Sequence, residues 1–197
     1  MHPYATDSDE RKDVLFYLAI ISVVFCYIFY SVLECYNISA PYWVSFPSVF
    51  GVFGFLYTVF NKWLWKLNFF HKIKLVKVPV LTGKWEGVLN SSYDNFLSDI
   101  GISISVYQNW TEMLVVLETS SSTSYSSTAS IITINPHCFT ITYEYINTPT
   151  PAALETMHTH IGTTTLEFKN YSIEMTGCYY SGRDRKTVGD IRVKRIT

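Results

Sequence analysis

The sequence predicts two transmembrane helices followed by an all-β domain, an eight-stranded antiparallel up-and-down barrel of the lipocalin-like type. Long uncharged runs lie before position 61, and short alternating segments rich in Val, Ile, Thr and Tyr fill the chain after Pro79. Only 16% of the 197 residues are charged, against roughly a quarter in average soluble domains. This composition argues against a disordered chain and against an ordinary soluble enzyme. The net charge of -1 provides no overall field to attract a nucleic-acid polymer.

The membrane region is expected over residues 14–60, as helices at 14–33 and 42–60 joined in a hairpin. The first run has no charge over twenty residues, and a helix of that length crosses the hydrocarbon core of a bilayer. A cleaved signal peptide is the alternative. The mixed acidic and basic leader at residues 1–13, together with the length of the run, argues against it.

Small residues recur every third position in the second run, at Ser48, Gly51 and Gly54. Such residues allow helix backbones to approach closely in lipid, where packing drives association. They either seat the second helix against the first or form an interface between copies of the chain. Both interpretations remain open from the sequence.

The orientation follows from the placement of lysine and arginine. Arg11 and Lys12 precede the first run, several lysines follow the second, and none lies between the two runs. The positive-inside rule therefore predicts a multi-pass protein of the bacterial inner membrane with both termini in the cytoplasm. Residues 61–78 mix lysines with Trp and Phe, a composition typical of a connector at the headgroup level.

Residues 79–197 are expected to form the cytosolic barrel. We predict eight strands, at 80–90, 100–108, 111–119, 124–135, 138–147, 157–168, 171–180 and 186–196. Closure would remove exposed strand edges and leave room for side chains or one small ligand. The longer connections all lie at the end of the barrel away from residue 79, so a cavity is expected to open there.

Candidate anion-binding residues gather in the last predicted hairpin. Arg183 and Arg185 lie at the expected mouth, where a planar guanidinium matches phosphate oxygens, and Thr187 follows them. A solvated surface pair with neighbouring acidic residues is the alternative.

Candidate stacking residues come from the strands themselves. Tyr107, Tyr143 and Tyr180 could stack on nucleobases while their hydroxyls form hydrogen bonds, although most tyrosines in β domains only fill core and surface. His160 could offer a further hydrogen bond inside the barrel. With these we expect a ligand site built from Tyr107, Tyr143, His160, Tyr180, Arg183, Arg185 and Thr187.

Catalytic and metal-binding motifs are missing from the sequence. His158 and His160 alternate onto one strand face without a carboxylate or third histidine at a suitable spacing, so no metal is expected. No nucleophile-and-base constellation or phosphate-binding loop occurs. The chain is therefore expected to be neither an enzyme nor a cofactor protein.

The segment Gly83-Lys84-Trp85-Glu86-Gly87 resembles the Gly-x-Trp opening of lipocalin-like barrels. In those barrels the Trp closes one end and the glycines permit close packing. With the two apolar runs, the connector, the eight strands and the patterns at 177–180 and 189–191, residues 14–197 resemble the two-transmembrane, β-strand-rich effectors of bacterial CBASS anti-phage systems.

This resemblance implies a cytosolic barrel that binds a cyclic dinucleotide made by a partner nucleotidyltransferase after phage infection. Binding would assemble the helices into a homo-oligomer and disrupt the inner membrane, which is abortive infection. The ligand would be the cyclic dinucleotide, with no further cofactor. Two other functions remain open: a membrane-tethered, lipocalin-like carrier or sensor of an apolar small molecule, and a structural scaffold whose barrel is filled by its own side chains.

Overall fold

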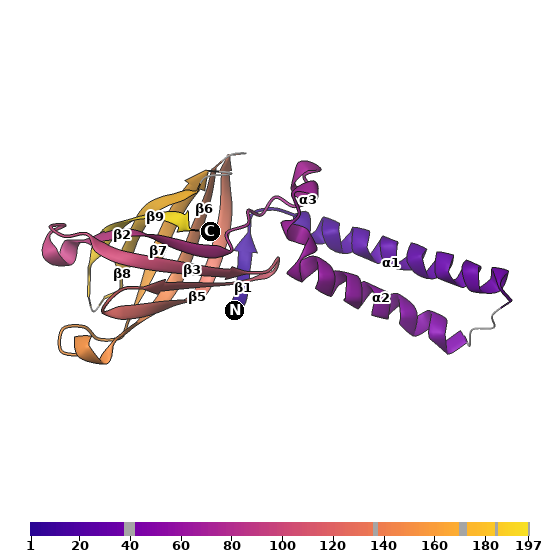
Figure 1. The fold of residues 1–197 in the computed structure, drawn as a ribbon, viewed down its shortest axis with the longest axis horizontal. Helices are drawn as coiled ribbons and strands as arrows, with labels where there is room; N and C mark the ends of the chain where they lie inside the picture. Colours follow the sequence, from indigo (N-terminus) through magenta and orange to yellow (C-terminus); the bar gives the residue numbers. More distant parts are fainter. Residues whose placement is uncertain (38–41, 136–137, 170–172, 184, 197) are drawn as a thin grey trace. The chain divides into compact units, whose positions relative to one another are not determined.

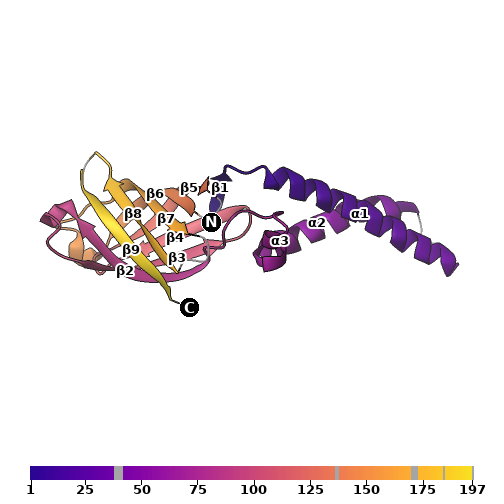
Figure 2. The same ribbon diagram turned by 90° about the horizontal axis from the view of Figure 1, so that it is seen from above.

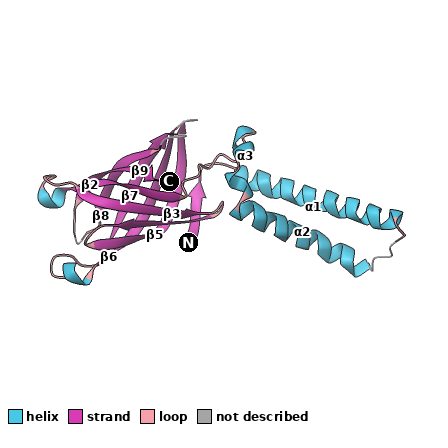
Figure 3. Cartoon of the chain, viewed as in Figure 1, coloured by secondary structure: helices cyan, strands magenta, loops and turns pink. Residues whose placement is uncertain are grey.

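The computed structural model describes residues 1–197 except 38–41, 136–137, 170–172, 184 and 197 (Figure 1). The chain forms two compact units. One joins Met1–Asp7 to Val78–Thr197 and is built of strands, and the other, Ser8–Lys77, is built of helices. Figure 3 colours the strands magenta and the helices cyan, including the short 3-10 helices η2 (Ser92–Asp94) and η3 (Pro151–Ala153) of the β unit.

The helical unit contains α1 (Glu10–Cys35), α2 (Tyr42–Lys62), the short 3-10 helix η1 (Leu64–Lys66) and α3 (Asn68–Lys72). Both long helices cover the runs in which helices were predicted. Among the described residues, α1 is the one helix whose length and composition would let it cross a bilayer. Most of its large apolar side chains are exposed, as expected of a surface that contacts lipid.

All eight predicted strands are present, with ends moved by a few residues. They are β2 (Gly83–Ser91), β3 (Ile100–Gln108), β4 (Glu112–Glu118), β5 (Ser122–Asn135), β6 (Cys138–Pro149), β7 (His160–Lys169), β8 (Glu174–Ser181) and β9 (Val188–Ile196). Each pairs antiparallel with the next, and β9 pairs back with β2, where the two lie side by side in Figure 2. The sheet therefore closes on itself as a barrel.

The structure has a ninth strand, β1 (His2–Thr6), which corrects the predicted count of eight. It inserts between β4 and β5. The first seven residues are thus part of the β unit, whereas residues 1–13 were predicted to be a separate leader. A five-residue strand that contains a proline shows too little alternation to be recognised, and its partners lie more than a hundred positions away in the chain.

One end of the barrel is filled by the segment that resembles the lipocalin opening. Trp85 is buried, and its indole N–H donates to the Leu81 carbonyl at 3.2 Å. The Arg195 guanidinium lies 4.6 Å from the centre of the Trp85 ring. Gly83 has a φ of +140°, and a Cβ at Gly87 would overlap the backbone of β9, so both positions require glycine.

Candidate ligand-binding site

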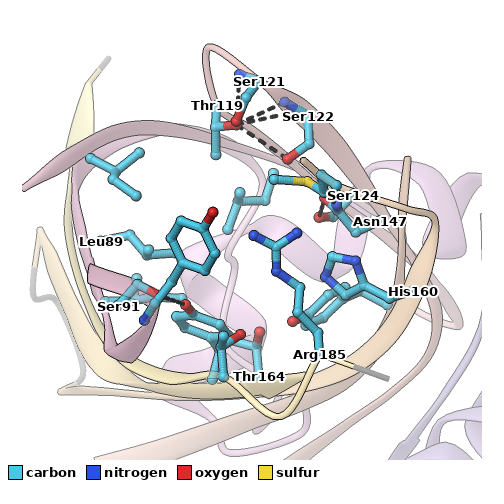
Figure 4. A pocket seen from close by; sticks show the side chains of 18 of the residues that line it. Leu89, Ser91, Thr119, Ser121, Ser122, Ser124, Asn147, His160, Thr164 and Arg185 are labelled. Atoms are coloured by element: carbon cyan, nitrogen blue, oxygen red, sulfur yellow. Dashed lines mark hydrogen bonds between the residues drawn. The ribbon is translucent and has the colours of Figure 1, made fainter. Parts of the chain in front are cut away.

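A cavity of about 260 Å³ opens at the other end of the barrel, away from Asp7 and Val78, where the chain leaves the β unit. It lies where β2, β4, β6 and β8 end and the following strands begin. The longer connections frame it, as the sequence predicted. Its walls combine hydroxyl, aromatic and apolar side chains (Figure 4).

Arg185 supplies the one Lys or Arg side chain in the described lining of the cavity, which contains no Asp or Glu. Its side chain points into the centre of the cavity in Figure 4, and the guanidinium lies 5.1 Å from the centre of the Tyr93 ring. The turn that carries it is closed by Ser181 and Thr187. The Thr187 N–H donates to the Ser181 hydroxyl at 2.9 Å, and the two hydroxyl oxygens are 2.8 Å apart. This turn presents a positive, fork-shaped donor to the interior.

Tyr143 and Thr164 lie deeper, as paired residues of β6 and β7. Tyr143 is only 2% exposed. Burial raises the pKa of the Tyr143 hydroxyl to about 12, and the neighbouring Thr164 side chain moderates that rise. No hydrogen bond of ordinary geometry reaches the Tyr143 hydroxyl from the described residues. A neutral hydroxyl therefore stands in the cavity wall with capacity to bond a ligand.

Tyr145 and Tyr179 provide ring faces in the same cavity. The Tyr179 hydroxyl donates to the Ser91 hydroxyl at 2.8 Å, which fixes its ring. Glycines make room for both rings: a Cβ at Gly162 would overlap the Tyr145 hydroxyl, and one at Gly189 would overlap the Tyr179 ring. Burial raises the pKa of Tyr145, so this hydroxyl is also neutral.

Polar groups from β5, β6 and β7 complete the cavity. The Ser124 hydroxyl donates to the Asn147 side-chain oxygen at 2.8 Å, and the Asn147 amide nitrogen meets the Met157 sulfur at 3.3 Å. Sulfur is a weak acceptor, so this amide can donate to a better partner. His160 Nδ1 lies 2.9 Å from the His158 carbonyl. Because a carbonyl only accepts, Nδ1 carries the hydrogen, and Nε2 is the ring atom left for a ligand.

Four of the seven predicted site residues line the cavity: Tyr143, His160, Arg185 and Thr187. The other three do not. Tyr107 and Tyr180 are each 54% exposed on the outer face, and Arg183 is exposed at the turn. For the two tyrosines the cause is strand parity, because successive side chains point to opposite faces: β8, for example, turns Tyr179 inward and Tyr180 outward.

Several residues of the cavity were missed by the sequence analysis: Ser91, Tyr93, Ser124, Tyr145, Asn147 and Tyr179. A usable signal for two of them was the glycine on a neighbouring strand, since Gly162 pairs with Tyr145 and Gly189 pairs with Tyr179. A glycine directly opposite an aromatic residue leaves space for its ring. The hydroxyl residues carry no comparable signal, because Ser and Thr occur on both faces of the sheet.

Two family models match the chain. The model described as Cap15, cyclic dinucleotide receptor domain, matches residues 76–195, and the one described as Cap15, TM helices, matches residues 12–66. The chain belongs to the Cap15 family. A curated Cap15-type relative, CD-NTase-associated protein 15 of Yersinia aleksiciae, is 30% identical over 154 residues, which cover 77% of this chain and 71% of the relative.

Membership in the Cap15 family confirms the resemblance to CBASS transmembrane effectors. The strand-built unit contains a cyclic dinucleotide receptor domain, and most of the helical unit matches the family's model for its TM helices, which makes the chain a membrane protein. Cap15 is a receptor and effector family and is not a known enzyme class. The cavity lies wholly within the matched receptor domain.

Proposed function

We propose that this Cap15 chain binds a cyclic dinucleotide in the cavity of its β unit and responds by assembling its helices and disrupting the bacterial inner membrane, so that the infected cell dies. The nucleotide would come from a cognate nucleotidyltransferase. The observation that carries the proposal is Arg185, a guanidinium that points into a cavity with no Asp or Glu in its described lining. Such a group suits the phosphates of a cyclic dinucleotide.

The cavity also suits the other parts of that ligand. A phosphate would contact Arg185 and the Thr187 hydroxyl, and the bases would lie against the rings of Tyr145 and Tyr179. Base edges would then reach the Tyr143 hydroxyl and the Asn147 amide, whose present partners leave bonding capacity. Every group in this arrangement belongs to the matched receptor domain.

We place both helices in the membrane as a hairpin, with the termini and the β unit in the cytoplasm. The basis is the lysine distribution, together with the exposed Trp63 and Phe69 beside these lysines. The Lys62 ammonium lies 5.8 Å from the centre of the Trp63 ring, a pair suited to the headgroup level. The cavity would then open toward the cytosol, where the nucleotide is made.

We assign the small residues of α2 to contacts between copies. A Cβ placed at Gly51 or Gly54 would meet nothing within 4 Å. These glycines therefore do not mark a close approach of α2 to α1, and the second of the two interpretations is favoured. A homo-oligomer built on this face would form when the ligand binds its assembled state better than its separated state.

A carrier of an apolar molecule remains the second candidate, because Leu89, Leu117 and Ile191 also line the cavity. Its weakness is the chemistry of the other wall. An apolar ligand would remove water from Arg185 and from several hydroxyls without offering them hydrogen bonds, and each such loss is unfavourable.

Isothermal calorimetry of the full-length protein in lipid nanodiscs distinguishes the two. We expect at least one member of a panel of cyclic dinucleotides to bind with one ligand per chain, and a fluorescent fatty acid not to compete with it. The same dinucleotide should release dye from liposomes that contain the protein. Binding of the fatty acid alone, or dinucleotide binding without dye release, would contradict the proposal.

A further inference from the structure

β1 lies outside both family matches, which begin at residues 12 and 76. It fills the gap in the barrel wall between β4 and β5, which we call the seam. In the described sheet, β4 and β5 pair directly only near the mouth, from Val116 to Glu118, and β1 separates them farther down. β1 runs antiparallel to β4 and parallel to β5. The β1–β5 pairing is the one parallel pairing among the described strands.

Side-chain contacts hold both ends of β1. His2 Nε2 lies 2.7 Å from the Ser126 hydroxyl, which also accepts a hydrogen bond from the Val115 N–H at 2.9 Å. Ser126 thus joins β1, β4 and β5 at the point where the last two separate. At the other end, the Asp7 carboxylate accepts hydrogen bonds from the Thr133 N–H at 2.8 Å and the Thr133 hydroxyl at 3.3 Å.

Tyr4 connects β1 to the wall of the cavity. It is 2% exposed and donates a hydrogen bond to the Trp110 carbonyl at 2.8 Å. Tyr4 pairs with Ala129 of β5, and Ala129 pairs with Tyr143 of β6. The pairings continue to two further residues of the cavity, so one row runs through Tyr4, Ala129, Tyr143, Thr164 and Tyr179. β1 is therefore one end of the row that forms the deep wall of the site.

The seam has the fewest paired residues in the described barrel wall. The unliganded cavity measures about 260 Å³, below the roughly 300–1,000 Å³ of pockets that enclose small molecules. A cyclic dinucleotide that entered this cavity fully would therefore widen the barrel. The β1 pairings with β4 and β5 and the β4–β5 pairing are short, whereas β5 and β6 pair from Ser122 to Asn135. Widening would separate the seam first, because the fewest backbone hydrogen bonds resist it there.

β1 is also tied to the membrane helix by a short connection. β1 ends at Thr6, and α1 begins at Glu10. Four residue steps reach at most about 14 Å. While β1 stays in the seam, the connection between β1 and α1 has no greater reach than that. Detachment of β1 would add its own residues to the connection.

We propose that β1 is a releasable strap: it closes the seam when the cavity is empty and leaves the seam when the ligand widens the barrel, which lengthens the connection to α1. The inference rests on the proposed function and adds the regulation of that site. Thermodynamic linkage between two equilibria is reciprocal. A ligand that favours release of β1 must therefore bind more tightly when β1 is already detached, and more weakly when β1 is held in the seam.

A reversible lock tests the strap. Ala5 and Ser130 are paired residues of β1 and β5, and neither is buried. The variant Ala5→Cys with Ser130→Cys, in a chain whose four native cysteines are serine, would be studied full-length in liposomes and nanodiscs. Under reducing conditions it should bind the dinucleotide and release dye as the parent does. After oxidation we expect affinity to fall at least tenfold and dye release to stop, with Ala5→Cys alone as the matched control.

The opposite perturbation is Tyr4→Ala, which removes the buried anchor of β1. We expect ligand affinity to rise and dye release to begin without ligand. In the parent protein, amide hydrogen exchange of residues 2–6 and 112–115 should accelerate when the ligand binds.

The two proposals fail in different ways. If the reduced double-cysteine variant and the parent bind no cyclic dinucleotide, the proposed function is rejected and the strap with it. If they bind normally but the oxidised lock still releases dye at the parent rate, or exchange at residues 2–6 slows on binding, the strap alone is overturned.

Discussion

Arg183 and Arg185 occupy the same turn in different environments. Arg183 is exposed, whereas Arg185 lines the cavity beside Tyr93. The Ser181 and Thr187 hydrogen bonds close the turn that carries both side chains. Residues two positions apart in a turn can differ this way because a turn reverses direction within a few residues.

Arg185→Ala should weaken binding of the cyclic dinucleotide by about 10- to 150-fold, since a hydrogen bond to a charged group contributes about 1.5–3 kcal/mol. Calorimetry on the full-length protein measures the loss. Arg183→Ala is the matched control and should leave affinity within about twofold. Equal losses in the two variants would show that general electrostatic attraction, and not the Arg185 contact, governs binding.

Tyr143→Phe should weaken ligand binding by about 2- to 13-fold, the effect of about 0.5–1.5 kcal/mol for one hydrogen bond. The thermal midpoint of the unliganded protein should not fall, because no described residue bonds this hydroxyl with ordinary geometry. Calorimetry and thermal unfolding give the two values. A lower midpoint with unchanged affinity would assign Tyr143 a structural role only.

Tyr143 also predicts a dependence of stability on alkaline pH. Its pKa is raised to about 12 from the ordinary 10.0. The unfolded chain therefore releases this proton at lower pH than the folded protein. The ionisation of Tyr143 therefore lowers the free energy of unfolding by about 1.4 kcal/mol per pH unit as the pH rises from about 10 to about 12. Unfolding of Tyr143→Phe in the same range should show a shallower fall, and an identical slope would contradict the assignment.

At the scale of the strand, the alternation of apolar and polar residues predicted well where the strands lie. It predicted less well which face of each strand is buried. The alternating apolar residues of β3, at Ile102, Ile104 and Val106, are all buried, and that pattern already placed Tyr107 outside. In β8 the inward positions include Gly177 and Tyr179. Because glycine has no apolar side chain, the alternation of apolar and polar residues that would mark the inward face is interrupted there. The neighbours of such a strand decide its face, since only packing against them distinguishes the two sides.

Gly189→Ala should destabilise the β unit by about 1–3 kcal/mol, the usual effect of overfilling a packed site. Its Cβ would overlap the Asn90 carbonyl and the Tyr179 ring. Thermal unfolding should show a midpoint lower by about 2–12 °C. Gly101→Ala is the matched control, because a Cβ there meets nothing within 4 Å. A similar loss in both variants would mean that glycine in a strand matters here for reasons other than close approach.

At the scale of the whole molecule, the chain carries two native probes of its orientation. Cys35 ends α1 and Cys178 lies in β8, and both are exposed. With the other three cysteines replaced by serine, a membrane-impermeant maleimide should label Cys35 in intact spheroplasts. It should label Cys178 only after lysis. Labelling of Cys178 in intact spheroplasts would reverse the proposed orientation.

Local patterns in the sequence were enough to find the apolar helix, the eight strands of the meander and the end at which the cavity opens. They also found four residues of the cavity. These features follow from the length of an apolar run, from charge and from alternation, which can all be read over a few neighbouring positions. Two features came only from the folded chain. The position of β1 depends on partners more than a hundred residues away, and the inward rings of Tyr145 and Tyr179 depend on the glycines that lie opposite them. Both result from pairings between distant segments, whose backbone hydrogen bonds and side-chain volumes are satisfied together only when the barrel closes.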